Sequence, residues 1–157
     1  MIGVSFGGII VQEISKIISV KKTIIISSVK TKKELPFMMT IGKSTGLYKY
    51  VPVNWIDNVE SLAKFVFGPS IKKKIGLYRK YLSVRDEHYL RWCIDKIINW
   101  DNEKVPKNLI HIHGSLDLVF PSVYISNAIL VKNATHAMIL TKASWLNKNI
   151  PELILKN

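Results

Sequence analysis

The sequence predicts an α/β fold with a mostly parallel sheet and flanking helices, from three observations. Short β-branched or apolar runs at 23–29, 109–113 and 128–131 are typical of buried strands. Amphipathic helical patterns alternate with these runs, and that alternation is typical of parallel sheets. A length of 157 residues and a hydrophobic share of 48% suit one domain with a packed core.

The first helix is expected directly after Gly8. Four isoleucines recur at helical spacing, and the polar side chains of the segment lie on the other side. We therefore expect the isoleucine face to pack on the sheet. The apolar residues are Ile10, Ile14, Ile17 and Ile18, and the polar ones are Gln12, Glu13 and Lys16.

Turn signals separate amphipathic pieces between the first and second strand runs. One helix is expected after Asn54, and another opens with Ser83 and Asp86 at the spacing of a capping box. The second carries an apolar stripe, which is interpreted as packing: Tyr89, Trp92, Cys93, Ile97 and Trp100. A last helix is expected from 137 to about 147, and Pro151 starts a final short turn.

The chain is strongly basic, with 23 Lys and Arg against 11 Asp and Glu and a formal charge of +12. Only Arg79, Arg85 and Arg91 are arginine, which argues against nucleic acid as a partner, because base and phosphate recognition favours arginine. The single cysteine, Cys93, excludes an internal disulfide and is interpreted as a buried, inert thiol. With no signal-peptide pattern at the start, the expected location is the cytoplasm.

The segment Gly3-Val4-Ser5-Phe6-Gly7 matches the pattern G-x-S-x-G. It lies after a few apolar residues and before a helical pattern, where a sharp strand-to-helix turn exposes the serine hydroxyl. Glycines two positions before and after Ser5 are expected to relieve crowding at this turn. The helix amino terminus places backbone N–H groups beside the serine, where they suit a developing oxyanion.

Two more polar residues follow predicted strands. Asp117 comes shortly after 109–113, and His136 comes shortly after 128–131. Because the carboxyl ends of parallel strands meet at one edge of a sheet, we expect both side chains to lie near Ser5. The chain order Ser, Asp, His is the order of α/β-hydrolases.

The elbow, the turn His113-Gly114-Ser115-Leu116-Asp117 and the turn Ala134-Thr135-His136 together resemble the carboxy-terminal part of the α/β-hydrolase superfamily. The resemblance implies one domain over 1–157, with 30–107 as a helical cap insertion between core strands. It implies Ser5 as nucleophile, His136 as general base and then acid, Asp117 as its orienting acid, and the Phe6 N–H as an oxyanion donor. It implies a small-molecule acyl substrate, such as an ester, with no metal and no organic cofactor.

Only Met1 and Ile2 precede Gly3, whereas the superfamily has several strands and helices before the elbow. We therefore expect an incomplete fold that lacks the upstream half, including the loop with the second oxyanion N–H. Two other readings stay open. One is a truncated, non-catalytic remnant that at most binds a partner, and the other is a membrane-surface binder through the basic, apolar stretch 71–82.

Two further patterns resemble a metal site and a phosphate-binding loop, but neither predicts one. His111 and His113 stand two apart on a strand and could present both imidazoles to a metal, but no third ligand has suitable spacing, so structural histidines are favoured. Gly42-Lys43-Ser44 resembles the end of a phosphate-binding loop, but Phe37 stands where its first glycine is required.

Overall fold

The computed structural model describes residues 1–50 and 86–155. Within them, four strands form one sheet in the order β1-β2-β3-β4, and each neighbouring pair is parallel. The α/β fold with a parallel sheet is therefore confirmed. The strands are β1 (Ile2–Val4), β2 (Thr23–Ile26), β3 (Leu109–Gly114) and β4 (Ile129–Val131).

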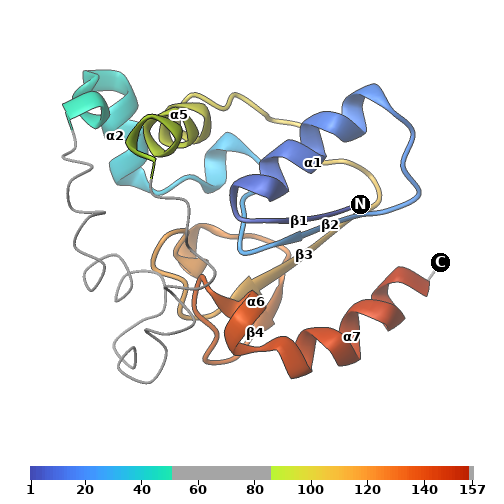
Figure 1. The fold of residues 1–157 in the computed structure, drawn as a ribbon. Helices are drawn as coiled ribbons and strands as arrows, with labels where there is room; N and C mark the ends of the chain where they lie inside the picture. The colour runs from blue at the N-terminus through green and yellow to red at the C-terminus, as the bar shows by residue number, and fades with distance from the viewer. Residues whose placement is uncertain (51–85, 156–157) are drawn as a thin grey trace.

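Helices cover both faces of the sheet, with α1 on one side and α7 on the other (Figure 1). One core cluster packs beneath α6 and α7 around Ile24, Ile112 and Met138, and another packs near α1 around Ile9 and Phe120. None of the helices in 1–50 and 86–155 is long and apolar enough to cross a membrane. The helices are α1 (Phe6–Ile17), α2 (Phe37–Thr45), α5 (Glu87–Ile98), α6 (Met138–Thr141) and α7 (Ala143–Leu155), with short 3₁₀ turns at Lys32–Glu34, Leu47–Tyr50 and Ser122–Tyr124.

Helix α1 packs on the sheet with a different face from the one predicted. Ile10 is 42% exposed and Ile17 is 83% exposed, whereas Gly8, Ile9 and Gln12 are buried. The Gln12 amide donates to the carbonyls of Gly8 and Val29, at 3.0 and 2.9 Å, so its N–H groups lose no hydrogen bonds on burial. The expectation of a buried isoleucine face was therefore wrong. The face of α1 that packs on the sheet contains Gln12, whose amide is hydrogen-bonded, and the small residue Gly8.

The described part of 30–107 contains helices α2 and α5, and α5 begins later than predicted. Its N-cap is Asp86, whose carboxylate accepts the Tyr89 N–H at 2.7 Å. Ser83 lies outside the described residues, as do the helix expected after Asn54 and the stretch 71–82. Only part of the apolar stripe packs inside, because Cys93 is buried while Trp92 is half exposed.

The carboxy-terminal helix also differs from the prediction. The helical segment breaks after α6, and α7 then runs from Ala143 to Leu155 with Pro151 inside it. Pro151 therefore does not start a separate turn. Proline removes one backbone N–H donor from a helix. Pro151 is exposed, so its ring does not take space from side chains of the core.

Candidate active site

Ser5 stands at the turn between β1 and α1 with an unusual backbone conformation. Its φ is 51° and its ψ is −124°, so a residue with a Cβ occupies a region that favours glycine. The Ser5 N–H donates to the Ile26 carbonyl at 2.9 Å, which ties the turn to β2. Strained backbone of this kind gathers at functional sites, and a strained serine at a strand-to-helix turn is the geometry of a nucleophile elbow.

The glycines around this turn have different roles. An ideal Cβ on Gly3 would lie 2.2 Å from the Gly7 carbonyl oxygen, so Gly3 is required for the close approach of β1 and α1. An ideal Cβ on Gly7 meets no described atom within 4 Å, so the expectation that Gly7 relieves crowding was wrong. Gly8, one position later, has that role, because its Cβ would lie 2.4 Å from Ser28 Oγ.

Asp117 follows β3 in a turn that binds its carboxylate. The Asp117 N–H donates to the Gly114 carbonyl at 3.2 Å. Oδ1 in turn accepts the backbone N–H groups of Val119 at 2.9 Å and Phe120 at 3.0 Å. The residue is only 2% exposed, so these donors and His136 replace water around its carboxylate.

His136 follows β4 and lies between the other two side chains. Its Nδ1 is 2.9 Å from Asp117 Oδ2, and its Nε2 is 2.8 Å from Ser5 Oγ. A carboxylate only accepts, so Nδ1 carries a hydrogen, and in the neutral form of the ring Nε2 accepts the Ser5 hydroxyl. The structure thus brings together Ser5 and His136, which are 131 residues apart in the chain.

Phe6 is the first residue of α1. Its N–H is one of the backbone donors that a helix leaves without an acceptor inside the helix, and it stands next to Ser5. Its ring packs edge-on against Trp92 of α5, with ring centroids 5.6 Å apart. Helix α5, from the segment between β2 and β3, therefore reaches the residue that follows the serine.

His111 and His113 lie on β3 behind Asp117 and are hydrogen-bonded to each other, with 3.2 Å between Nε2 and Nδ1. Burial, together with nearby His113 and Lys30, lowers the pKa of His111 to about 3. Burial also lowers the pKa of His113. In 1–50 and 86–155 no group of three or more metal-ligating side chains is found. Because the two imidazoles are buried and bond each other and the Phe120 carbonyl, they form a buried hydrogen-bond network.

These two histidines predict an acid-sensitive fold. Their pKa values are lower in the folded chain than the ordinary 6.5, so the unfolded chain binds protons first as the pH falls. Stability is therefore retained above about pH 7 and declines below it, by about 0.7 kcal/mol between pH 7 and 6 for His111, and His113 adds a loss of the same sign. Urea unfolding at a series of pH values measures this slope. The slope should be smaller in H111Q than in the parent chain, and an equal slope in H111Q would contradict the assignment.

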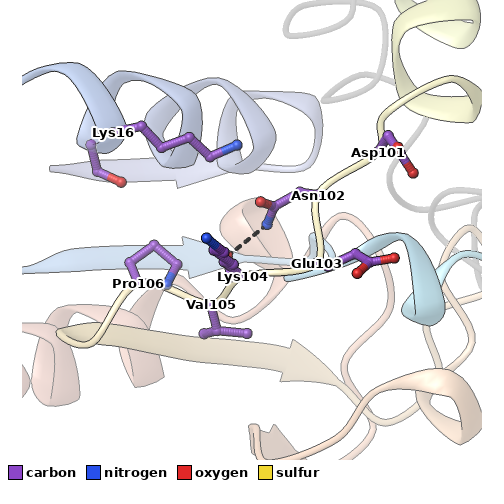
Figure 2. Close-up of a pocket in the computed structure, with 8 residues that line it drawn as sticks. Lys16, Asp101, Asn102, Glu103, Lys104, Val105 and Pro106 are labelled. Carbon is purple, nitrogen blue, oxygen red and sulfur yellow. Dashed lines mark hydrogen bonds between the residues drawn. The ribbon is translucent and has the colours of Figure 1, made fainter.

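A cavity of about 740 Å³ lies elsewhere. Figure 2 shows its polar lining between the end of α1 and the segment before β3, including Lys16, Asp101, Asn102 and Glu103. Ser15, another lining residue, is ten positions along the chain from Ser5, so the cavity lies about 15 Å from the serine along the axis of α1. It contains none of Ser5, Asp117 and His136.

Sequence comparison finds no matching family model, and no curated protein matches either. Solved structures do match. A hydrolase from Pseudomonas aeruginosa PA01 has a TM-score of 0.70 at 14% identity, over 99% of this chain and 64% of that one. An α/β-hydrolase enzyme from a Medee basin deep-sea metagenome library has a TM-score of 0.66 at 15% identity, over 99% and 64%. An esterase from Rhodococcus sp. ECU1013 has a TM-score of 0.64 at 12% identity, over 99% and 65%.

These likenesses cover nearly all of this chain, which spans about two thirds of the length of the structures it matches. The shared features are the parallel sheet and its flanking helices, and identities this low show the fold alone. The fold of the chain is therefore that of the α/β-hydrolases in an incomplete form.

Proposed function

We propose that the chain is a serine hydrolase that cleaves an ester or a similar acyl substrate through a covalent acyl-enzyme. One observation carries the proposal: a continuous series of hydrogen bonds from the buried Asp117 carboxylate through His136 to the Ser5 hydroxyl. A neutral imidazole oriented by an acid and bonded to a hydroxyl is the arrangement that activates serine. The strained Ser5 backbone independently supports the same role.

In the first step, Ser5 Oγ attacks the carbonyl carbon of the substrate while His136 Nε2 takes the hydroxyl proton. Asp117 remains ionised and holds the imidazolium through Nδ1–H. The tetrahedral intermediate then collapses, and Nε2–H gives its proton to the leaving alcohol. The products of this half-reaction are the alcohol and the acyl ester of Ser5.

In the second step, His136 Nε2 takes a proton from water, which attacks the acyl ester and releases the acid and free Ser5. The negative charge on the substrate oxygen is proposed to meet the Phe6 N–H at the positive end of α1. One such donor supplies about 10²–10³ in rate. The Phe6 N–H is therefore the proposed oxyanion donor of the described chain.

The acyl group is proposed to be apolar or aromatic. The rings of Trp92 and Tyr89 on α5 stack, with centroids 6.1 Å apart, and each side chain is about half exposed. Trp92 also contacts Phe6, the residue after Ser5. Exposed aromatic surface beside a reactive serine suits an apolar acyl chain. The insertion 30–107 would shape this side of the pocket as a cap.

A fluorophosphonate probe tests the proposal directly. Ser5 Oγ should displace fluoride from phosphorus and form one phosphonylated site per folded chain, located by peptide mass spectrometry. Ser5→Ala should reduce labelling to background, because no other described serine is bonded to His136. Ser144→Ala, an exposed serine of α7, is the matched control and should label like the parent chain. Equal labelling of S5A and the parent would reject the role of Ser5.

A second candidate is a hydrolase-like domain that binds a partner or a membrane surface without turnover. A folded parent chain that resists the probe supports this candidate, and salt-sensitive binding to anionic vesicles would then point to the basic stretch 71–82. For either candidate we propose a cytoplasmic location, consistent with a single, buried, free cysteine.

A further inference from the structure

A buried set of polar side chains lies behind Asp117 and takes no part in the steps above. Lys30 follows β2, and His111 and His113 stand on one face of β3. Their exposed fractions are 6%, 3% and 0%. Burial of polar groups is unfavourable unless each is hydrogen-bonded, so the pairing within this set determines which atoms carry hydrogens.

The hydrogen positions follow from the far end of the set. The Phe120 carbonyl lies 2.8 Å from His113 Nε2 and only accepts, so Nε2 carries the hydrogen of the neutral ring. His113 Nδ1 must then accept, and its partner at 3.2 Å is His111 Nε2, which therefore donates. His111 Nδ1 is left as an acceptor.

The contact with Lys30, at the other end of the set, requires the same hydrogen positions. The Lys30 ammonium only donates, and its Nζ lies 3.5 Å from His111 Nδ1. Two independent ends, a donor-only ammonium and an acceptor-only carbonyl, thus assign the same Nε2–H tautomer to both imidazoles. The hydrogen bonds all point from Lys30 toward the turn that holds Asp117.

Lys30 is itself fixed. Its Nζ pairs with Glu34 Oε1 at 2.8 Å and also donates to the Ser126 carbonyl. Its backbone N–H donates to Glu34 Oε2 at 2.8 Å, and its carbonyl accepts from the Asn102 amide at 2.8 Å. Burial would raise the pKa of Glu34, but the hydrogen bonds from Lys30 and Ser126 lower it below its ordinary value. The start of the series therefore has little freedom to move.

The series ends at Asp117, the residue proposed to orient His136. His113 Nε2 bonds the Phe120 carbonyl and also lies 3.6 Å from Asp117 Oδ2. The N–H groups of Phe120 and Val119 bind Asp117 Oδ1. His113 thus binds Phe120, whose backbone N–H binds Asp117 Oδ1. The Nε2–H group of His113 also lies near the other carboxylate oxygen, Oδ2.

We propose that Lys30, His111 and His113 form a positioning chain for Asp117. Lys30 and the Phe120 carbonyl together set the tautomers of the two histidines, and His113 fixes the carboxylate against His136. The role in catalysis rests on the proposed function, whereas the tautomers do not. The charged or titratable groups that face the chain are Glu34 beside Lys30, and Asp117 and His136 beside His113.

Nitrogen-15 NMR of the full chain tests the tautomers without any assumption about activity. Long-range proton–nitrogen spectra of the four histidines, assigned with single His→Gln variants, should show His111 and His113 as neutral Nε2–H rings at pH 8. In Lys30→Met, the Phe120 carbonyl should still keep both rings in the Nε2–H form, and the Nδ1 resonance of His111 should shift because that nitrogen loses its donor. A parent chain with either ring in the Nδ1–H form, or titrating near pH 6.5, overturns the proposal.

The second arm measures the pH dependence of fluorophosphonate labelling. His113→Gln keeps an amide N–H donor and should label within about threefold of the parent, whereas His113→Leu should label about 10–100-fold more slowly. In H113L the acidic limb of the profile should also move to higher pH, because loss of the N–H dipole favours the imidazolium of His136. Only variants that unfold cooperatively are compared.

The two arms separate the two proposals. A parent chain that is not labelled rejects the proposed function, and the NMR spectra still decide the tautomers. A labelled parent with the same rate and pH profile in H113L overturns the positioning role.

Discussion

Substituting Asp117 with asparagine (D117N) is expected to slow labelling of Ser5, and any ester hydrolysis, by about 10⁴-fold. The reason lies in how the turn binds the side chain. Two backbone N–H groups contact Oδ1, so the amide oxygen of asparagine would take that place and its NH₂ would face His136 Nδ1. Nδ1 would then have to accept, Nε2 would carry the hydrogen, and His136 could no longer take the Ser5 proton.

The measurement is the second-order rate of labelling by the fluorophosphonate at pH 8. Asp101→Asn is the matched control, because Asp101 is an exposed carboxylate that pairs with Lys32 at 2.7 Å, away from Ser5. It should label like the parent chain. A loss of less than tenfold in D117N, with the fold intact, would mean that the bond between Asp117 and His136 has no role in the reaction.

Gly3→Ala is expected to destabilise the chain by about 3 kcal/mol or more. The added methyl would lie 2.2 Å from the Gly7 oxygen and 2.6 Å from the Gly7 carbonyl carbon. Both are backbone atoms of α1, so the strand and the helix must separate to accommodate it. Ser5 lies between them, and labelling should therefore fall together with stability.

Gly7→Ala is the matched comparison at the same turn. A Cβ there meets no described atom within 4 Å, and alanine is a better helix residue than glycine, so stability should stay the same or rise by up to about 1 kcal/mol. Urea unfolding followed by circular dichroism measures both variants. Similar losses in G3A and G7A would refute the difference that the structure assigns to the two glycines.

The positions of Ser5, Asp117 and His136 could be predicted because they depend on a topological rule. Each residue closely follows a strand, and parallel strands bring such residues to one edge whatever their separation in the chain. The hydrogen bonds among them agree with that prediction. Their catalytic roles stay a proposal until Ser5 is labelled.

The packing of α1 could not be predicted from periodicity. The isoleucine pattern is strong, but the buried face is decided by Gln12, whose partner at Val29 lies 17 residues along the chain. The role of His111 was equally hidden, because Lys30 is 81 residues away and no spacing rule links the two. Such pairs form only when the sheet is assembled, so local patterns carry no signal for them.

The backbone of Ser5 has a consequence for how this sequence balances folding against chemistry. At a φ of 51° a serine is disfavoured relative to glycine by about 1–3 kcal/mol. A chain optimised for folding alone would place glycine at this turn. The serine thus opposes folding at the position where its hydroxyl meets an imidazole, which is the trade expected of a residue kept for reactivity.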